Sequence, residues 1–119
     1  MSNRGSAVVE FALVVPLVLL LLLGVVEVAL VARGQLMVIS AAREGAREAA
    51  ATPDPAAAVR AARAALGDAG SKARVSVRRP HVVGQPARVR VVMPYRVAAP
   101  LLGGFSIDLT ASAAMRVER

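Results

Sequence analysis

The chain has no cysteine and no tryptophan, and its aromatic residues are two phenylalanines and one tyrosine. The absence of cysteine excludes disulfides, iron–sulfur clusters and thiolate metal sites, but it leaves the redox compartment open. Apolar residues make up 56% of the sequence and are mostly Ala, Val and Leu. A domain built from such small side chains buries only a thin core, so we expect it to rely on a helix or on neighbouring proteins. The 119 residues have room for one small domain once a membrane segment is set aside.

Residues that carry catalysis or bind metals are also scarce. His81 is the only histidine, and it lies between Pro80 and Val82 in an expected turn, without the convergent His, Cys or carboxylate partners that a metal site needs. No spacing of Ser, His and Asp indicates a catalytic triad, and there is no glycine-rich phosphate loop. We therefore expect no enzymatic activity, no metal and no cofactor.

The formal net charge is +7, and arginine greatly outnumbers lysine. The basic residues are spread along the sequence, and the excess of Arg beside abundant Ala, Val and Gly is typical of genomic base composition. Nucleic-acid binding would require a contiguous basic face with stacking aromatics. We expect no nucleic-acid partner, and a DNA-binding role is a hypothesis based on net charge alone.

A long apolar run near the N-terminus is the strongest positive signal. Phe11–Val26 is sixteen residues without a charge, and the wider run Ser6–Ala32 is interrupted only by Glu10 and Glu27. Crossing roughly 30 Å of hydrocarbon takes about 20 helical residues, so the run spans a bilayer if one Glu lies at each interface. A cleaved secretory signal would be shorter and would end at a small-residue cleavage site. We therefore predict a retained signal anchor.

Three residues in this run need an explanation. An ionisable group at membrane depth is costly, so Glu10 is expected to have a partner or a task. Pro16 removes one helical hydrogen bond, which predicts a kink that neighbouring helices must accommodate. Glu27 is either an interfacial residue that ends the span or a contact to another membrane component.

Helix-forming composition continues beyond the membrane run to about residue 51, which predicts a helical stalk over 33–52. The segment Thr52–Pro55 ends it, because each proline disfavours helix in the residue before it. Asp54 and Pro55 are an N-cap and first-turn pair that opens a second helix over 56–66, and Gly67 ends that helix.

The rest of the sequence alternates with period two, which is typical of half-buried strands. Strands are expected over 73–79, 87–97 and 106–118, with a turn at 84–86 and a loop at 100–104. Pro94 predicts that the second half of its strand is an edge or an end. The inward-facing residues would be Val75, Val77, Val89, Val91, Met93, Tyr95, Ile107, Leu109, Ala111, Ala113, Met115 and Val117.

Four segments together resemble the TadE-like family of the tight-adherence (Flp) pilus systems, whose members are pseudopilins. The segments are Arg4–Pro16, Gly24–Glu27, Ala41–Arg47 and Leu109–Glu118. The resemblance implies a pilin-like α+β fold with a long N-terminal transmembrane and stalk helix, a short second helix and a small antiparallel sheet of three to four strands. The implied domains are a leader peptide at 1–5, a transmembrane helix at 6–32, a helical stalk at 33–52 and an extracytoplasmic domain at 53–119.

The resemblance also implies cleavage by a prepilin peptidase after Gly5. Ser6 would become the new N-terminus, Glu10 matches the family's fifth-position carboxylate, and Phe11 matches its aromatic neighbour. The new ammonium group would lie near a Glu10 carboxylate, of another subunit or of the same helix, where residues four apart are neighbours. Glu10, Pro16 and Glu27 are the residues expected to act in subunit assembly.

The implied function is that of a membrane-anchored pseudopilin or minor pilin, needed to assemble a pilus and so for surface adhesion. Its partners would be the peptidase, other pilins and pseudopilins, inner-membrane assembly proteins and the lipid bilayer. The resemblance places the N-terminus in the cytoplasm and the C-terminal part outside the inner membrane. A naive positive-inside count of Arg33, Arg43 and Arg47 against Arg4 favours the reverse, although that rule weakens for long translocated domains. The alternative function is an unprocessed, signal-anchored envelope protein whose sheet binds another protein.

Overall fold

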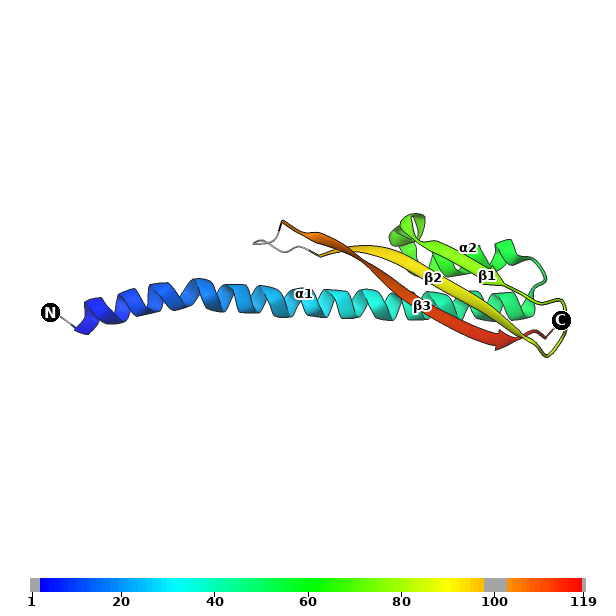
Figure 1. The fold of residues 1–119 in the computed structure, drawn as a ribbon, viewed down its shortest axis with the longest axis horizontal. Coiled ribbons are helices and arrows are strands. Elements are labelled where there is room, and N and C mark those ends of the chain that lie inside the picture. The colour runs from blue at the N-terminus through cyan, green and yellow to red at the C-terminus, as the bar shows by residue number, and fades with distance from the viewer. Residues whose placement is uncertain (1–2, 98–102, 119) are drawn as a thin grey trace. The chain divides into compact units, whose positions relative to one another are not determined.

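A computed structural model describes residues 3–97 and 103–118 of the chain (Figure 1). The chain divides into two compact units, Met1–Leu30 and Val31–Arg119. The first helix, α1 (Asn3–Ala51), contributes residues to both units. The prediction of one continuous helix that ends before Pro53 is confirmed. At its end, the Thr52 backbone N–H donates to the Glu48 carbonyl oxygen (2.9 Å) and the Thr52 hydroxyl donates to the Glu48 carboxylate (2.8 Å).

The second helix, α2 (Pro55–Leu66), begins and ends where its capping residues predict. A side-chain oxygen of Asp54 accepts a hydrogen bond from the Ala56 backbone N–H at 3.0 Å, and Pro55 occupies the first helical position. Gly67 ends the helix with φ of +61°, a conformation that side chains rarely adopt. A short 3-10 helix, η1 (Gly67–Lys72), then leads into the sheet.

The sheet has three antiparallel strands in the order β1-β2-β3, which confirms the α+β fold and fixes the strand number at three. The strands are β1 (Arg74–Arg78), β2 (Pro86–Val97) and β3 (Phe105–Arg116). β1 pairs with β2 only as far as Val92, so beyond Val92 β2 pairs with β3 alone. Pro94 lies in that part of β2, so the predicted edge position is confirmed.

Two connections join these strands. In the predicted turn at 84–86, Gly84 has φ of +92° and its N–H donates to the Val117 carbonyl oxygen at 2.9 Å. The predicted loop at 100–104 lies partly outside the described residues. Its two glycines, Gly103 and Gly104, have φ of +75° and +80°.

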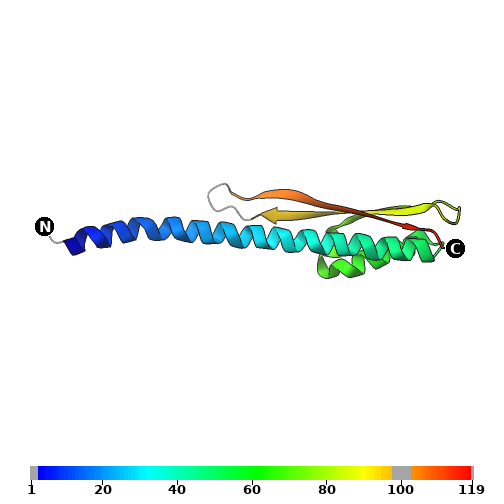
Figure 2. The ribbon, with the colours of Figure 1, turned by 90° about the horizontal axis from the view of Figure 1, so that it is seen from below.

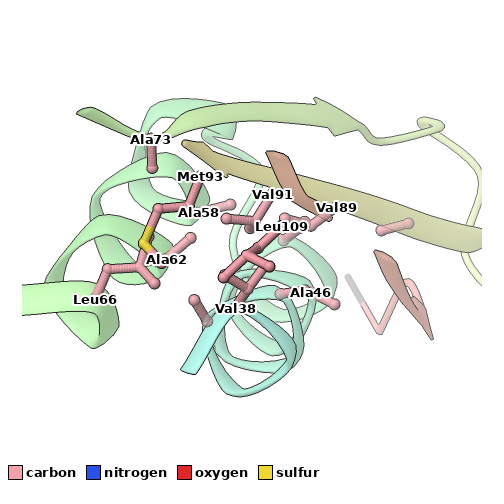
Figure 3. Packing of buried hydrophobic residues seen from close by; sticks show 14 of the residues in the cluster. Val38, Ala46, Ala58, Ala62, Leu66, Ala73, Val89, Val91, Met93 and Leu109 are labelled. Atoms are coloured by element: carbon pink, nitrogen blue, oxygen red, sulfur yellow. The ribbon is translucent and has the colours of Figure 1, made fainter. Parts of the chain in front are cut away.

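One hydrophobic core joins α2 and the C-terminal part of α1 to a single face of the sheet (Figures 2 and 3). The expected inward-facing residues of the strands are buried or partly buried, except Met115, which is 40% exposed. Most helical members of the core are alanines, so the core is thin, as the composition predicts. The buried residues are Val38, Ala41, Ala42, Ala46, Ala49, Ala58, Ala62, Leu66, Ala73, Ala87, Val89, Val91, Met93, Leu109 and Val117.

Two glycines allow α1 to lie close to its neighbours. A Cβ added to Gly34 would lie 2.8 Å from Leu109 Cδ1. A Cβ added to Gly45 would lie 3.0 Å from Val89 Cγ1 and 3.1 Å from Ala62 Cβ. Residues 31–51 of α1 therefore form part of the compact unit that holds the sheet, and the domain boundaries drawn from the sequence remain predictions.

The last turn of α1 is also fixed by hydrogen bonds from distant parts of the chain. Arg79 Nε donates to the Ala49 carbonyl oxygen at 2.7 Å, and the Glu118 backbone N–H donates to the Ala50 carbonyl oxygen at 3.0 Å. Helix C-termini leave carbonyl groups without helical partners, and these two bonds satisfy two of them.

Candidate membrane anchor and assembly site

The first unit consists of residues 3–30 of α1, and its apolar side chains are not buried within the chain. Of these described residues, Val15 and Glu27 are partly buried and the others are exposed. None of the most apolar 18-residue window of α1 is buried, unlike the core helix of a soluble protein. The exposed large apolar residues are Val8, Val9, Phe11, Leu13, Val14, Leu17, Val18, Leu19, Leu20, Leu21, Leu22, Leu23, Val25, Val26, Val28 and Leu30.

A continuous apolar surface of this size is not compatible with exposure to water as a monomer. By length and composition, α1 is therefore a candidate membrane span, consistent with membrane anchoring. The seventeen residue steps from Glu10 to Glu27 cover about 26 Å at the rise of an α-helix, close to the hydrocarbon thickness of roughly 30 Å. Both carboxylates can thus lie near the two boundaries of the hydrocarbon.

Glu10 and Glu27 point in different directions from α1. At 3.6 residues per turn, seventeen steps leave them about 100° apart around the helix axis. Among the described residues neither forms an ion pair. A single straight neighbouring helix therefore cannot cover both carboxylates, and no side chain of the described residues provides either of them with an ion-pair partner.

Four predicted processing residues lie at the start of α1. Gly5, Ser6, Glu10 and Phe11 are all exposed, and Phe11 has 71% of its surface exposed. A Cβ added to Gly5 would have no atom within 4 Å, so packing within the chain does not require glycine there. Because α1 begins at Asn3, the bond between Gly5 and Ser6 lies in its first turn. Ser6 and Glu10 are four residues apart and so lie on the same side of the helix.

Pro16 and Gly24 lie farther along the same span, and α1 continues through both. Pro16 has no N–H to donate to the Ala12 carbonyl oxygen, so that acceptor needs another partner in a bilayer. A Cβ added to Gly24 would have no atom within 4 Å, although glycine costs a helix about 1 kcal/mol relative to alanine. Nothing within the described chain accounts for either residue.

The segment Ala41–Arg47 has a buried side and a solvated side. Gly45 and Ala46 are buried against α2 and the sheet, whereas Arg43 and Arg47 are exposed. Arg47 Nη2 pairs with Glu44 Oε1 at 2.7 Å, and this hydrogen bond and the carboxylate charge raise the pKa of Arg47 above its ordinary value. The motif is therefore a packing element whose outer residues face solvent.

Residues 5–47 of the chain match the family model described as TadE-like protein. This matched stretch, residues 5–47, is called the TadE-like domain below. The match confirms the resemblance read from the N-terminal motifs, while the segment Leu109–Glu118 lies outside the matched residues. No curated protein and no solved structure matches the chain. The TadE-like family is a structural, pilus-associated family, which suggests a role in tight-adherence pilus assembly.

The TadE-like domain includes all six predicted site residues and most of α1, but none of the sheet. Among the described residues, no group of three or more His, Cys, Asp or Glu side chains is arranged to hold a metal ion. His81 lies exposed in the connection between β1 and β2.

One feature of the sheet was missed from the sequence. The basic residues are spread along the sequence, as described above, but the pairing of β1 with β2 brings several arginines together on the exposed face of the sheet. Period-two alternation already placed Arg88 and Arg90 on the outward side. The pairing register with β1, which brings Arg78 opposite Arg88, was the missing information.

Proposed function

We propose that this chain is a membrane-anchored pseudopilin or minor pilin, needed to assemble a tight-adherence pilus and so for surface adhesion. A prepilin peptidase removes residues 1–5 at the cytoplasmic face. The sheet-bearing unit, Val31–Arg119, lies outside the inner membrane. The observation that carries the proposal is the position of Gly5 and Glu10 at the start of an exposed apolar helix with a TadE-like match.

The first turn of α1 is suited to cleavage. The N–H groups of a helix's first turn have no helical acceptor, so unwinding this turn breaks few hydrogen bonds. Gly5 lowers the cost further because glycine is a weak helix former. No side chain of the described residues packs where a Cβ on Gly5 would lie, so a peptidase can approach the bond without disturbing the core.

Cleavage would change the charge at the membrane boundary. The new α-ammonium of Ser6 lies one helical turn from Glu10, and a neighbouring subunit can bring its own ammonium to the same carboxylate. Either pairing offsets part of the desolvation cost of a carboxylate in hydrocarbon. The pairing between subunits is the one that promotes lateral assembly.

Pro16 and Glu27 provide two further contacts in this proposal. Helices of other pilins or of inner-membrane assembly proteins satisfy the Ala12 carbonyl oxygen that Pro16 leaves without a donor. Because Glu27 points about 100° away from Glu10, it contacts a different neighbour. Lipid covers the remaining apolar surface of the span.

Mass spectrometry of the mature N-terminus tests the processing step. In cells with the peptidase we expect a chain that begins at Ser6, and in cells without it a chain that retains residues 1–5. Gly5→Leu should block cleavage, whereas Gly24→Leu, a matched substitution within the span, should leave it unchanged. An intact N-terminus in cells that contain the peptidase would support the alternative of an unprocessed, signal-anchored envelope protein.

A further inference from the structure

The face of the sheet that the helices leave uncovered carries several exposed arginines, and four of them lie where β1 pairs with β2: Arg74 and Arg78 on β1 and Arg88 and Arg90 on β2. These four residues are called the arginine face below. Arg78 pairs directly with Arg88 across the two strands, and Arg90 follows two residues later on the same side of β2. Backbone positions directly opposite each other lie about 5 Å apart, and i,i+2 positions about 7 Å apart.

Among the described residues, Arg74 is the member of this set that forms an ion pair. Arg74 Nη2 lies 3.7 Å from Asp108 Oδ2, and both side chains are more than half exposed. Within residues 3–97 and 103–118, no carboxylate lies within ion-pair distance of Arg78, Arg88 or Arg90. Like charges directly opposite each other in a sheet are destabilising, so stability of the domain does not explain the cluster.

The arginine face also has the shape and the donors of an anion-binding surface. Two shallow hollows lie on it, one bounded by Arg78, Arg88 and Arg90 and the other by Arg74 and Arg90. The hydroxyl groups of Ser76, Thr110 and Ser112 line the same hollows. Guanidinium groups bind carboxylate and phosphate oxygens through paired N–H donors, and hydroxyl groups supply further donors.

We propose that the arginine face docks an acidic, extended segment of another pilus-assembly protein. The inference rests on the proposed function, because it takes the partner to be a component of the same assembly. Side chains on one face of an extended segment repeat about every 7 Å, which is the spacing of Arg88 and Arg90. Carboxylates at alternate positions of such a segment can therefore pair with successive arginines.

Two other occupants fit the surface less well. A second copy of this chain is disfavoured, because Val31–Arg119 has fourteen Lys and Arg residues against six Asp and Glu, and two copies repel each other. Nucleic acid is disfavoured because no aromatic side chain lines the hollows to stack on bases.

A binding experiment tests the chemistry of the arginine face. The full-length protein in phosphatidylcholine nanodiscs is titrated with a fluorescent peptide of alternating Glu and Ser. The triple variant Arg78→Gln/Arg88→Gln/Arg90→Gln should weaken binding about tenfold or more, from three charge-assisted contacts. The control variant Arg43→Gln/Arg63→Gln/Lys72→Gln removes the same charge from other exposed positions and should change binding less than about twofold.

Three outcomes of this titration would overturn the proposal. Equal weakening by both triple variants would show a non-specific response to net charge. Tighter binding of duplex DNA than of the peptide, or loss of peptide binding when the nanodiscs contain phosphatidylglycerol, would assign the surface to phosphates. Thermal unfolding of both variants checks that the fold is retained.

An experiment in cells tests the partner. Arg88→Glu/Arg90→Glu should abolish pili while the chain retains its abundance and its mature N-terminal mass. A single Asp or Glu changed to Lys or Arg in another assembly protein should then restore pili. If the double variant assembles normal pili while Glu10→Ala does not, this inference fails and the proposed function stands. If both variants assemble normal pili, the proposed function fails as well.

Discussion

Residues 3–30 and residues 31–51 belong to the same helix, α1, but differ in the size and burial of their side chains. The first stretch is rich in Leu and Val, and these side chains are exposed. The second has glycine and alanine at the positions that face the sheet, and these residues are buried. Glycine follows the same division, since Gly24 has open space around it, whereas Gly45 has Val89 and Ala62 close by.

The contrast indicates what covers each stretch. Small residues allow the second stretch to approach its own sheet and α2, so its surroundings are already present in the chain. Large apolar residues without contacts require a cover from outside, which in the proposed function a bilayer and neighbouring subunits supply. Substitutions in the first stretch should therefore affect assembly, and those in the second should affect stability.

The largest expected effect is on assembly. Glu10→Ala should abolish pili, because no other carboxylate of the described chain lies near the Ser6 ammonium. The free energy of unfolding of the sheet-bearing unit should stay within about 0.5 kcal/mol of the wild-type value. Electron microscopy of cell surfaces and thermal unfolding of the purified protein measure the two effects. Normal pili in this variant would contradict the division between the stretches.

The second comparison removes one leucine from each unit. Leu66 is 2% exposed, and Leu66→Ala should lower the free energy of unfolding by about 2–5 kcal/mol because it leaves a cavity in the core. Leu22 is 56% exposed, so Leu22→Ala should leave that unfolding transition unchanged. Chemical denaturation of the full chain in detergent, followed by circular dichroism, gives both values.

The third comparison adds a side chain at one glycine of each stretch. Gly45→Val should destabilise the fold by about 1–3 kcal/mol, since its Cβ would crowd Val89 and Ala62. Gly24→Val meets no atom within 4 Å and should leave the unfolding transition unchanged. Equal effects at both positions would show that the added Cβ acts through helix propensity and not through packing.

The smallest expected effect concerns the capping of α2. Asp54→Ala removes the acceptor of the Ala56 N–H and should lower the free energy of unfolding of the sheet-bearing unit by about 1 kcal/mol. Asp54→Asn keeps a capping oxygen and should recover most of that loss. Since Asp54 lies outside the TadE-like domain and 49 residues after Gly5, cleavage after Gly5 should be unaffected in both variants.

Most of the secondary structure could be predicted because its signals are local. Asp54, Pro55 and Gly67 mark the ends of α2, and period-two alternation identified the buried side of each strand. The prediction that Met115 is buried was wrong, because alternation gives the direction of a side chain but not what covers it. The local pattern cannot show how far the helices extend over the sheet.

In the candidate site, too, features set by local spacing could be predicted from the sequence, whereas features set by packing could not. The positions of Gly5, Ser6 and Glu10 relative to α1 follow from helical spacing alone. The roles of Gly34 and Gly45 required the sheet and α2 to be in place, although their spacing of eleven residues, about three helical turns, places them on one side of α1. The arginine face required the register between β1 and β2, which strand patterns do not specify.

The hydrogen bonds at the end of α1 have a consequence for the order of folding. Ala49 and Ala50 lie before the whole sheet in the sequence, yet their carbonyl oxygens are satisfied by Arg79, after β1, and by Glu118, after β3. In the proposed orientation the chain emerges from the membrane one residue at a time after α1, so these acceptors depend on water until β3 has followed. In that orientation the sheet-bearing unit completes its fold only after β3 has been translocated. A chain truncated before Val117 would leave the carbonyl oxygen of Ala50 without its Glu118 donor.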